Sequence, residues 1–248
     1  MFSQLLSLIP LVVLAILPSL IWLFFYLKED PHPEPRLWLI IMFIMGVALA
    51  PIVIFAEMAF GKALNFLAII PFGGGMLMFV IAPLVEEAAK YGAVHLSLNK
   101  NPVLDEPVDC MIYIIVAALG FAAIENIFAI FSFISVGAPG YFSDAFNFMS
   151  MRFISAVALH GLASGIMGYF FARFYFIKRN PLLIVWGIFL ASLLHGIYNF
   201  LLFKDGQYMS LILTGGLLLA AAALVMFLFN RLKYHTTYQQ VAVDNMEK

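Results

Sequence analysis

Five ionisable side chains stand inside long apolar segments of this sequence. They are Glu86, Glu87, Glu125, His160 and His195. An ionisable group at the centre of a lipid bilayer costs about 2.5–3.5 kcal/mol on insertion scales, so such groups normally face a cavity or one another and mark functional sites. Carboxylates and imidazoles are the side chains that move protons and bind metal ions. The set therefore indicates acid–base or metal-assisted chemistry.

Helical spacing places polar partners beside these groups. Glu86 and Lys90 are four residues apart, as are His195 and Asn199, so each pair shares one helix face. The first pair has the spacing of a structural ion pair, but Glu87 has no local partner of its own. His195 and Asn199 can donate hydrogen bonds toward one point, although a buried Asn is also a common contact between membrane helices.

The other residue types argue against several routes to peptide hydrolysis in a membrane. All aspartates before the C-terminal tail lie in expected loops, which excludes an aspartyl pair, and no glutamate follows a histidine, which excludes the His-Glu-x-x-His zinc motif. Ser164 and Ser192 lie near His160 and His195 in sequence, but neither has the glycine frame of a serine nucleophile. A carboxylate that activates water remains, with the histidines and Asn199 stabilising the oxyanion.

The elements that position these residues must be membrane-spanning helices. Of the 248 residues, 64% are apolar and 11% are charged, against about 45–50% and 25% in ordinary globular chains. A chain of this length cannot bury so much apolar surface away from water. The composition excludes a soluble enzyme, a nucleic-acid-binding protein and a disordered adaptor, and the single Cys110 excludes an intramolecular disulfide framework.

We therefore expect an all-α polytopic membrane protein, a single domain over 1–248 in which seven transmembrane helices enclose a polar chamber. A span needs roughly 20 residues. Runs of suitable length occur at 5–27, 37–56, 76–98, 111–133, 153–176, 182–203 and 208–229. Residues 61–75, broken by Pro71 and three glycines, are expected to be re-entrant or to form an eighth span, and residues 135–151 to form a loop.

The distribution of Lys and Arg predicts the orientation of the bundle. Basic residues gather around Lys28, Lys100 and Lys178 and in the tail, and the positive-inside rule assigns these connections to the cytoplasm. Seven spans then place the N-terminus outside and the C-terminus in the cytoplasm, in the cell membrane. In this orientation the mid-span residues lie about seven to ten residues from the outer ends of their helices, so we expect them to meet at one level.

Four motifs stand on successive spans. In chain order they are Glu86-Glu87-x-x-Lys90, Phe121-x-x-x-Glu125-Asn126, His160 and His195-x-x-x-Asn199. They resemble the motifs of the PrsW family of glutamic-type intramembrane proteases, which is similar to the group that contains the CAAX prenyl endopeptidases. The resemblance extends to the loop segments Asp30–Pro35 and Asp105–Asp109.

This resemblance implies an intramembrane endopeptidase that cleaves single-pass membrane proteins, for example an anti-sigma factor in a stress response, near the outer membrane face. It implies that Glu86 and Glu87 supply the base, that His160 orients water, and that His195 and Asn199 form the oxyanion hole.

Three further residues have less specific roles. Glu125 is expected to be a second acid or to hold water, and Lys90 and Asn126 are expected to support the site.

Two other functions stay open at this point. The same residues suit zinc, with Glu86, Glu125, His160 and His195 as ligands, whereas the glutamic mechanism requires no cofactor. Mid-membrane carboxylates and histidines also mark transporters and proton relays, although no inverted repeat is visible. The expected partners are the lipid bilayer and a membrane-protein substrate, and no nucleic acid.

Overall fold

A computed structural model describes residues 2–66, 77–203 and 207–246 of the chain. Every regular element in these ranges is a helix, which confirms the expected all-α fold. In chain order they are α1 (Phe2–Leu27), α2 (Arg36–Phe66), the π-helical turn η1 (Leu77–Ile81), α4 (Ala82–Leu98), α5 (Pro107–Phe133), α6 (Tyr141–Arg152), the π-helical turn η2 (Phe153–Val157), α7 (Ala158–Ala172), the π-helical turn η3 (Arg173–Ile177), α8 (Leu182–Phe203) and α9 (Gln207–Met246).

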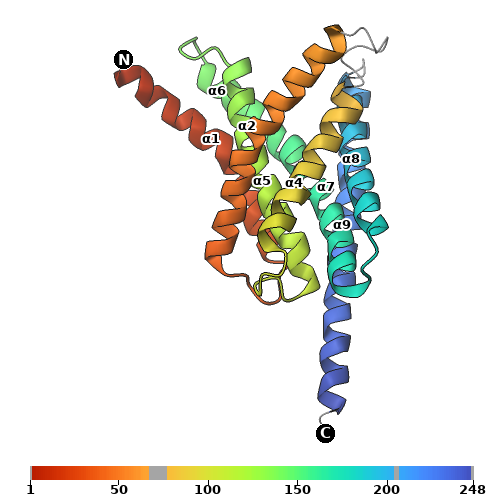
Figure 1. Ribbon diagram of the computed structural model, residues 1–248. Coiled ribbons are helices and arrows are strands. Elements are labelled where there is room, and N and C mark those ends of the chain that lie inside the picture. Colours follow the sequence, from red (N-terminus) through yellow and green to blue (C-terminus); the bar gives the residue numbers. More distant parts are fainter. Residues whose placement is uncertain (1, 67–76, 204–206, 247–248) are drawn as a thin grey trace.

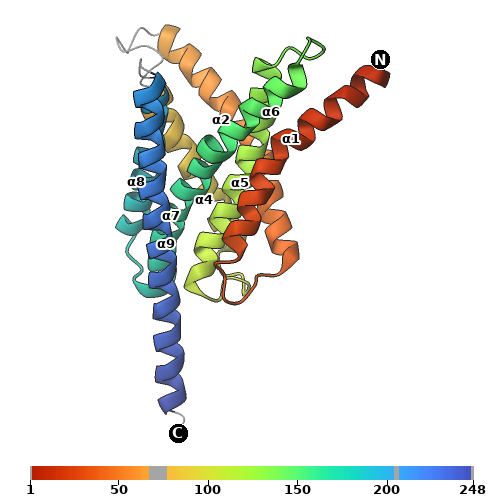
Figure 2. The same cartoon turned by 180° about the vertical axis from the view of Figure 1, so that it is seen from behind.

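Within the described ranges, six helical segments are long and apolar enough to cross a membrane. They are Leu8–Leu27, Arg36–Ala63, Pro107–Phe133, Tyr141–Ile177, Leu182–Phe203 and Tyr208–Tyr234. The 17-residue α4 is not among them, and it carries three charged side chains at its middle. The start of α1 and the end of α9 lie at opposite ends of the bundle (Figures 1 and 2). The count of seven or eight crossings stays a prediction.

Helix α5 forms the centre of the bundle and packs against α1, α2 and α7. All of its side chains from Pro107 to Ala123 are buried. Two glycines bring α2 and α5 together: a Cβ on Gly46 would lie 1.9 Å from the carbonyl oxygen of Ala117, and one on Gly120 would lie 2.1 Å from that of Phe43. Small residues permit such close approach of membrane helices, so this contact fixes the position of α5.

The helices of the structure differ from two predicted boundaries. The expected loop at 135–151 contains α6, which begins after Gly140 at a φ of 80° and continues through η2 into the predicted span. The helix that contains the span predicted at 37–56 continues to Phe66, because most of the residues that follow, such as Glu57, Met58 and Ala59, have high helix propensity.

Two further predicted segments differ from the structure at their ends. Helix α9 continues beyond the expected residue 229 to Met246. Of the segment predicted to be re-entrant, residues 61–66 belong to α2, and residues 67–75 lie outside the described ranges.

Candidate active site

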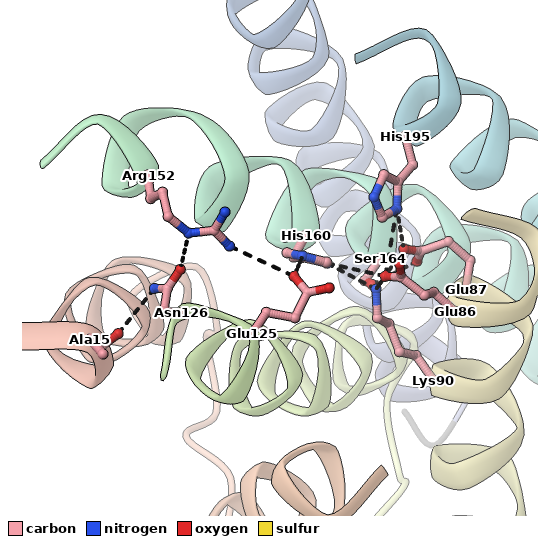
Figure 3. Close-up of polar contacts among 10 residues, drawn as sticks. All are labelled: Ala15, Glu86, Glu87, Lys90, Glu125, Asn126, Arg152, His160, Ser164 and His195. Carbon is pink, nitrogen blue, oxygen red and sulfur yellow. Dashed lines mark hydrogen bonds and ion pairs between the residues drawn. The ribbon is translucent and has the colours of Figure 1, made fainter. Parts of the chain in front are cut away.

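The predicted polar residues meet in one network between four helices (Figure 3). Helix α4 contributes Glu86, Glu87 and Lys90, α5 contributes Glu125 and Asn126, α7 contributes His160 and Ser164, and α8 contributes His195. All of them lie within helices and none lies in a loop, so the packing of the helices determines the geometry.

The ammonium group of Lys90 is the centre of this network. Its side chain is 0% exposed, and its Nζ donates to Glu87 Oε1 at 2.8 Å and to Glu86 Oε2 at 3.2 Å. It also contacts Nδ1 of His160 at 2.9 Å and lies 4.6 Å from the centre of the Phe121 ring. The ion pair predicted from spacing therefore exists, but it extends to α5 and α7.

These contacts define the protonation of His160. Because an ammonium can only donate, Nδ1 accepts from Lys90, and the ring proton lies on Nε2. Nε2 is 2.6 Å from Glu125 Oε2, where it donates to the carboxylate. Lys90, His160 and Glu125 thus form a chain of hydrogen bonds that orients the imidazole.

The two adjacent glutamates have different surroundings. Glu87 is 0% exposed, and both of its oxygens are engaged: Oε1 contacts Lys90 and, at 3.3 Å, His195 Nδ1, while Oε2 accepts from Ser164 Oγ at 3.0 Å. Glu86 contacts Lys90 through Oε2 alone, and it lines a cavity that Glu87 does not reach. The structure therefore separates two residues that the sequence treats as equivalent.

The ring of His195 stands edge-on to that of His160, with 5.2 Å between the ring centres and an interplanar angle of 84°. Its Nδ1 donates to Glu87, which as a carboxylate only accepts. Nε2 has no hydrogen-bond partner among the described residues, so this nitrogen is the one available to a ligand.

A cavity of about 380 Å³ opens beside the network. Its polar lining consists of Glu57, Glu86, Glu125, Arg152, His160, His195, Tyr198 and Asn199. The predicted candidates Glu86, Glu125, His160, His195 and Asn199 thus share one space, whereas Glu87, Lys90 and Asn126 lie behind its wall.

Sequence reasoning missed two charged residues of this cavity. Glu57 directly follows the predicted span at 37–56, and the longer α2 carries it into the lining. Arg152 falls between the predicted loop at 135–151 and the predicted span at 153–176. Its Nε donates to Asn126 Oδ1 at 2.5 Å, its guanidinium lies 3.9 Å from Glu125, and Asn126 in turn donates to the carbonyl of Ala15 at 3.0 Å. Asn126 therefore positions Arg152.

Neither nearby serine has the contacts of a nucleophile. Ser164 donates to Glu87, and Ser192 Oγ donates to the carbonyl oxygen of Pro83 at 3.3 Å. A serine nucleophile needs a hydrogen bond to its base, and neither hydroxyl contacts a histidine.

Four donors suit a metal ion by type and spacing. Single ligand atoms of Glu86, Glu87, His160 and His195 all lie within 4.8 Å of one another, and imidazoles with carboxylates are common zinc ligands. Glu125, which the zinc hypothesis included, lies on the other nitrogen of His160 and outside this set. Lys90 Nζ lies among three of the four donors, so an ion there competes with the ammonium for the same lone pairs.

Residues 34–230 match a family described as "PrsW family intramembrane metalloprotease". Curated relatives named "Protease PrsW" include those of Geobacillus kaustophilus, 29% identical over 76% of this chain and 78% of the relative, and Clostridioides difficile, 30% identical over 83% and 84%. A third, from Oceanobacillus iheyensis, is 30% identical over 80% and 85%. No solved structure matches the chain at a significant level.

Proposed function

Because the chain belongs to the PrsW family of intramembrane proteases, we propose that it hydrolyses single-pass membrane proteins with a water molecule activated by Glu86. One observation carries the proposal: of the two adjacent glutamates, Glu86 alone lines the cavity, while both oxygens of Glu87 are engaged by protein groups. Placement in the cell membrane, cleavage near its outer face and an anti-sigma factor as substrate belong to the same proposal.

The chemical step needs a general base and hydrogen-bond donors for the oxyanion in the same cavity. Glu86 accepts a proton from water as the water oxygen attacks the scissile carbonyl carbon, and it then delivers that proton to the leaving amine nitrogen. The oxyanion accepts hydrogen bonds from the amide of Asn199 and from Nε2 of His195. Nδ1 of His195 already donates a hydrogen bond to Glu87. Nε2 can therefore donate to the oxyanion only when the imidazole carries both protons, and Glu87 is then the counter-ion of the imidazolium.

The remaining residues hold this arrangement. Lys90 fixes the carboxylate of Glu86 and the tautomer of His160, whose Nε2 donates to Glu125. Glu125 itself lines the cavity, where its second oxygen can hold the attacking water. We assign Glu125 this water-holding role and Lys90 a positioning role.

The decisive comparison is between Glu86→Gln and the wild type. Both proteins are reconstituted in liposomes with candidate single-pass membrane proteins, and the fragments are identified by mass spectrometry. Loss of a general base reduces the rate by about 10²–10⁴-fold, so we expect Glu86→Gln to remain folded and to lose cleavage.

Asp144→Asn is the matched control, because this exposed carboxylate on α6 lies outside the cavity lining. Its cleavage should equal that of the wild type. Undiminished cleavage by Glu86→Gln, with the same products, would refute the role of Glu86 as base.

A metal-dependent protease is the second candidate, and the spacing of four donors supports it. Glu86, Glu87, His160 and His195 would hold the ion, which would supply Lewis-acid activation of water. Metal analysis of the purified protein and cleavage assays after chelation distinguish the two. Stoichiometric zinc, with activity that is lost on chelation and restored by zinc, would favour the second candidate.

A further inference from the structure

A second group of carboxylates lies far from the cavity, where the loop between α1 and α2 meets the start of α5. It consists of Asp30, Glu34, Asp105, Glu106 and Asp109, and all but Asp105 are buried. Figure 1 shows the two segments at the same end of the bundle. Asp109 and Glu125 lie 16 residues apart on α5, roughly 24 Å along the helix axis, so this group, the acidic cluster, is separate from the proposed active site.

Two overlapping sets of three carboxylates in the acidic cluster have the spacing of ligands around a cation. Single carboxylate oxygens of Asp30, Glu106 and Asp109 lie within 4.8 Å of one another, and so do those of Glu34, Asp105 and Asp109. Two oxygens on opposite sides of a Ca²⁺ ion, each at about 2.4 Å, are about 4.8 Å apart, so oxygens no farther apart than this can share one ion. Asp109 belongs to both sets, and its side chain is 0% exposed.

Helix capping explains only one oxygen of Asp109. Oδ2 accepts from the backbone N–H groups of Glu106 at 2.7 Å and of Asp105 at 3.0 Å, which is the usual role of an acidic residue in the first turn. Oδ1 is buried and has no hydrogen-bond donor among the described residues. From the α1–α2 loop, the carboxyl of Glu34 lies within hydrogen-bonding reach of the carboxyl of Asp109. Two facing carboxyls need a proton or a cation between them.

The surrounding protein supplies little positive charge. In the described part of the chain, no Lys or Arg nitrogen lies within 4.0 Å of these carboxylates, and the one ion pair is between Glu106 and His32, whose side chain is 65% exposed. Tyr113 donates a hydrogen bond to Glu34, and burial raises the pKa of Asp30 and of Glu34. Several buried carboxylates without a counter-ion are strongly unfavourable.

We propose that a hard divalent cation, Ca²⁺ or Mg²⁺, binds at Asp109, the carboxylate that the two sets share. The ligands are all oxygens, which these ions prefer, whereas zinc and other borderline ions favour sites with nitrogen or sulfur. The bound cation joins the α1–α2 loop to the first turn of α5. Because α5 also carries Glu125, the cation stabilises the helix against which the active site is assembled.

The test uses the full-length protein in detergent, stripped with a chelator and titrated with Ca²⁺ or Mg²⁺. We expect saturable binding and a rise in the unfolding temperature of roughly 5 °C at saturation. Tb³⁺ provides a direct probe, because Tyr113 next to Glu34 can sensitise its luminescence. Ca²⁺ should displace Tb³⁺.

Variants locate the site. Asp30→Asn and Glu34→Gln should abolish the Tb³⁺ signal and the thermal shift. Glu29→Gln should retain both, because Glu29 lies in the same loop but pairs with Lys233 at 2.8 Å. Glu86→Gln should also bind Tb³⁺ as the wild type does, so the result is independent of the proposed catalytic base.

Two outcomes would overturn the proposal. In the first, neither ion changes the unfolding temperature of the wild type, and Glu34→Gln is as stable as the wild type. The facing carboxyls would then share a proton and bind no cation. The other is Tb³⁺ binding that Asp30→Asn and Glu34→Gln leave unchanged.

Discussion

Lys90 is the residue on which the polar network depends. It is the shared partner of Glu86, Glu87 and His160, and it is buried among groups that would otherwise repel one another. Coulomb repulsion between two carboxylates is large where water is excluded. A lysine at this position therefore offsets the repulsion between the side chains of two adjacent glutamates on one helix.

Removing Lys90 or Glu87 alone should be strongly destabilising. Breaking a buried ion pair from one side costs about 3–5 kcal/mol, because the remaining charge loses its partner. We expect Lys90→Met and Glu87→Gln each to lower the free energy of unfolding by this amount, and the double variant to lower it by less than the sum. Denaturant titration in detergent measures all three.

The control for this cycle is Lys178→Met, since Lys178 is exposed. Its free energy of unfolding should differ from that of the wild type by less than about 0.5 kcal/mol. Additive losses in the double variant would contradict the coupling between Lys90 and Glu87.

At the scale of elements, the contact between α2 and α5 determines which side chains reach the cavity. The backbones approach at Gly46 and Gly120, and α2 also carries Glu57 into the lining. At η2, just before His160, the carbonyl of Phe153 accepts a hydrogen bond from Trp22 Nε1 at 2.8 Å. Such π-helical turns often occur next to functional sites, and here the turn precedes the helix that presents His160.

Gly120→Ala should separate α2 from α5. Its Cβ would lie 2.1 Å from a backbone oxygen, so the helices must move apart, and we expect a lower unfolding temperature together with reduced cleavage. Gly92→Ala is the matched control, because a Cβ there meets no atom within 4 Å. It should be neutral or stabilising by up to about 1 kcal/mol. Equal unfolding temperatures for the two variants would argue against the close contact.

At the scale of the whole molecule, the sequence predicts an orientation that thiol labelling can test. The single cysteine, Cys110, is 0% exposed, so introduced cysteines can be labelled against a low background. Val136→Cys, between α5 and α6, should react with an impermeant maleimide from outside the cell. Lys178→Cys should react only after the membrane is opened. The reverse pattern would mean that the positive-inside prediction is wrong.

The sequence by itself determined the class of fold and the candidate residues. Apolar runs with few charges require helices in lipid, and mid-span glutamates and histidines stand out because each is costly there. This reasoning finds Glu86, Glu125, His160 and His195 without any contact information. It could not find Glu57 or Arg152, since both lie at the ends of apolar runs and only the observed helix lengths bring them into the cavity.

The tertiary structure decided the roles within the set. Glu86 and Glu87 are adjacent in sequence, and only the packing of α4 against α7 and α8 turns one toward the cavity and surrounds the other with Ser164 and His195. A side chain's direction around its helix axis depends on how neighbouring helices pack. That packing depends on close contacts between residues distant in sequence, such as Gly46 with Ala117, which no local pattern contains.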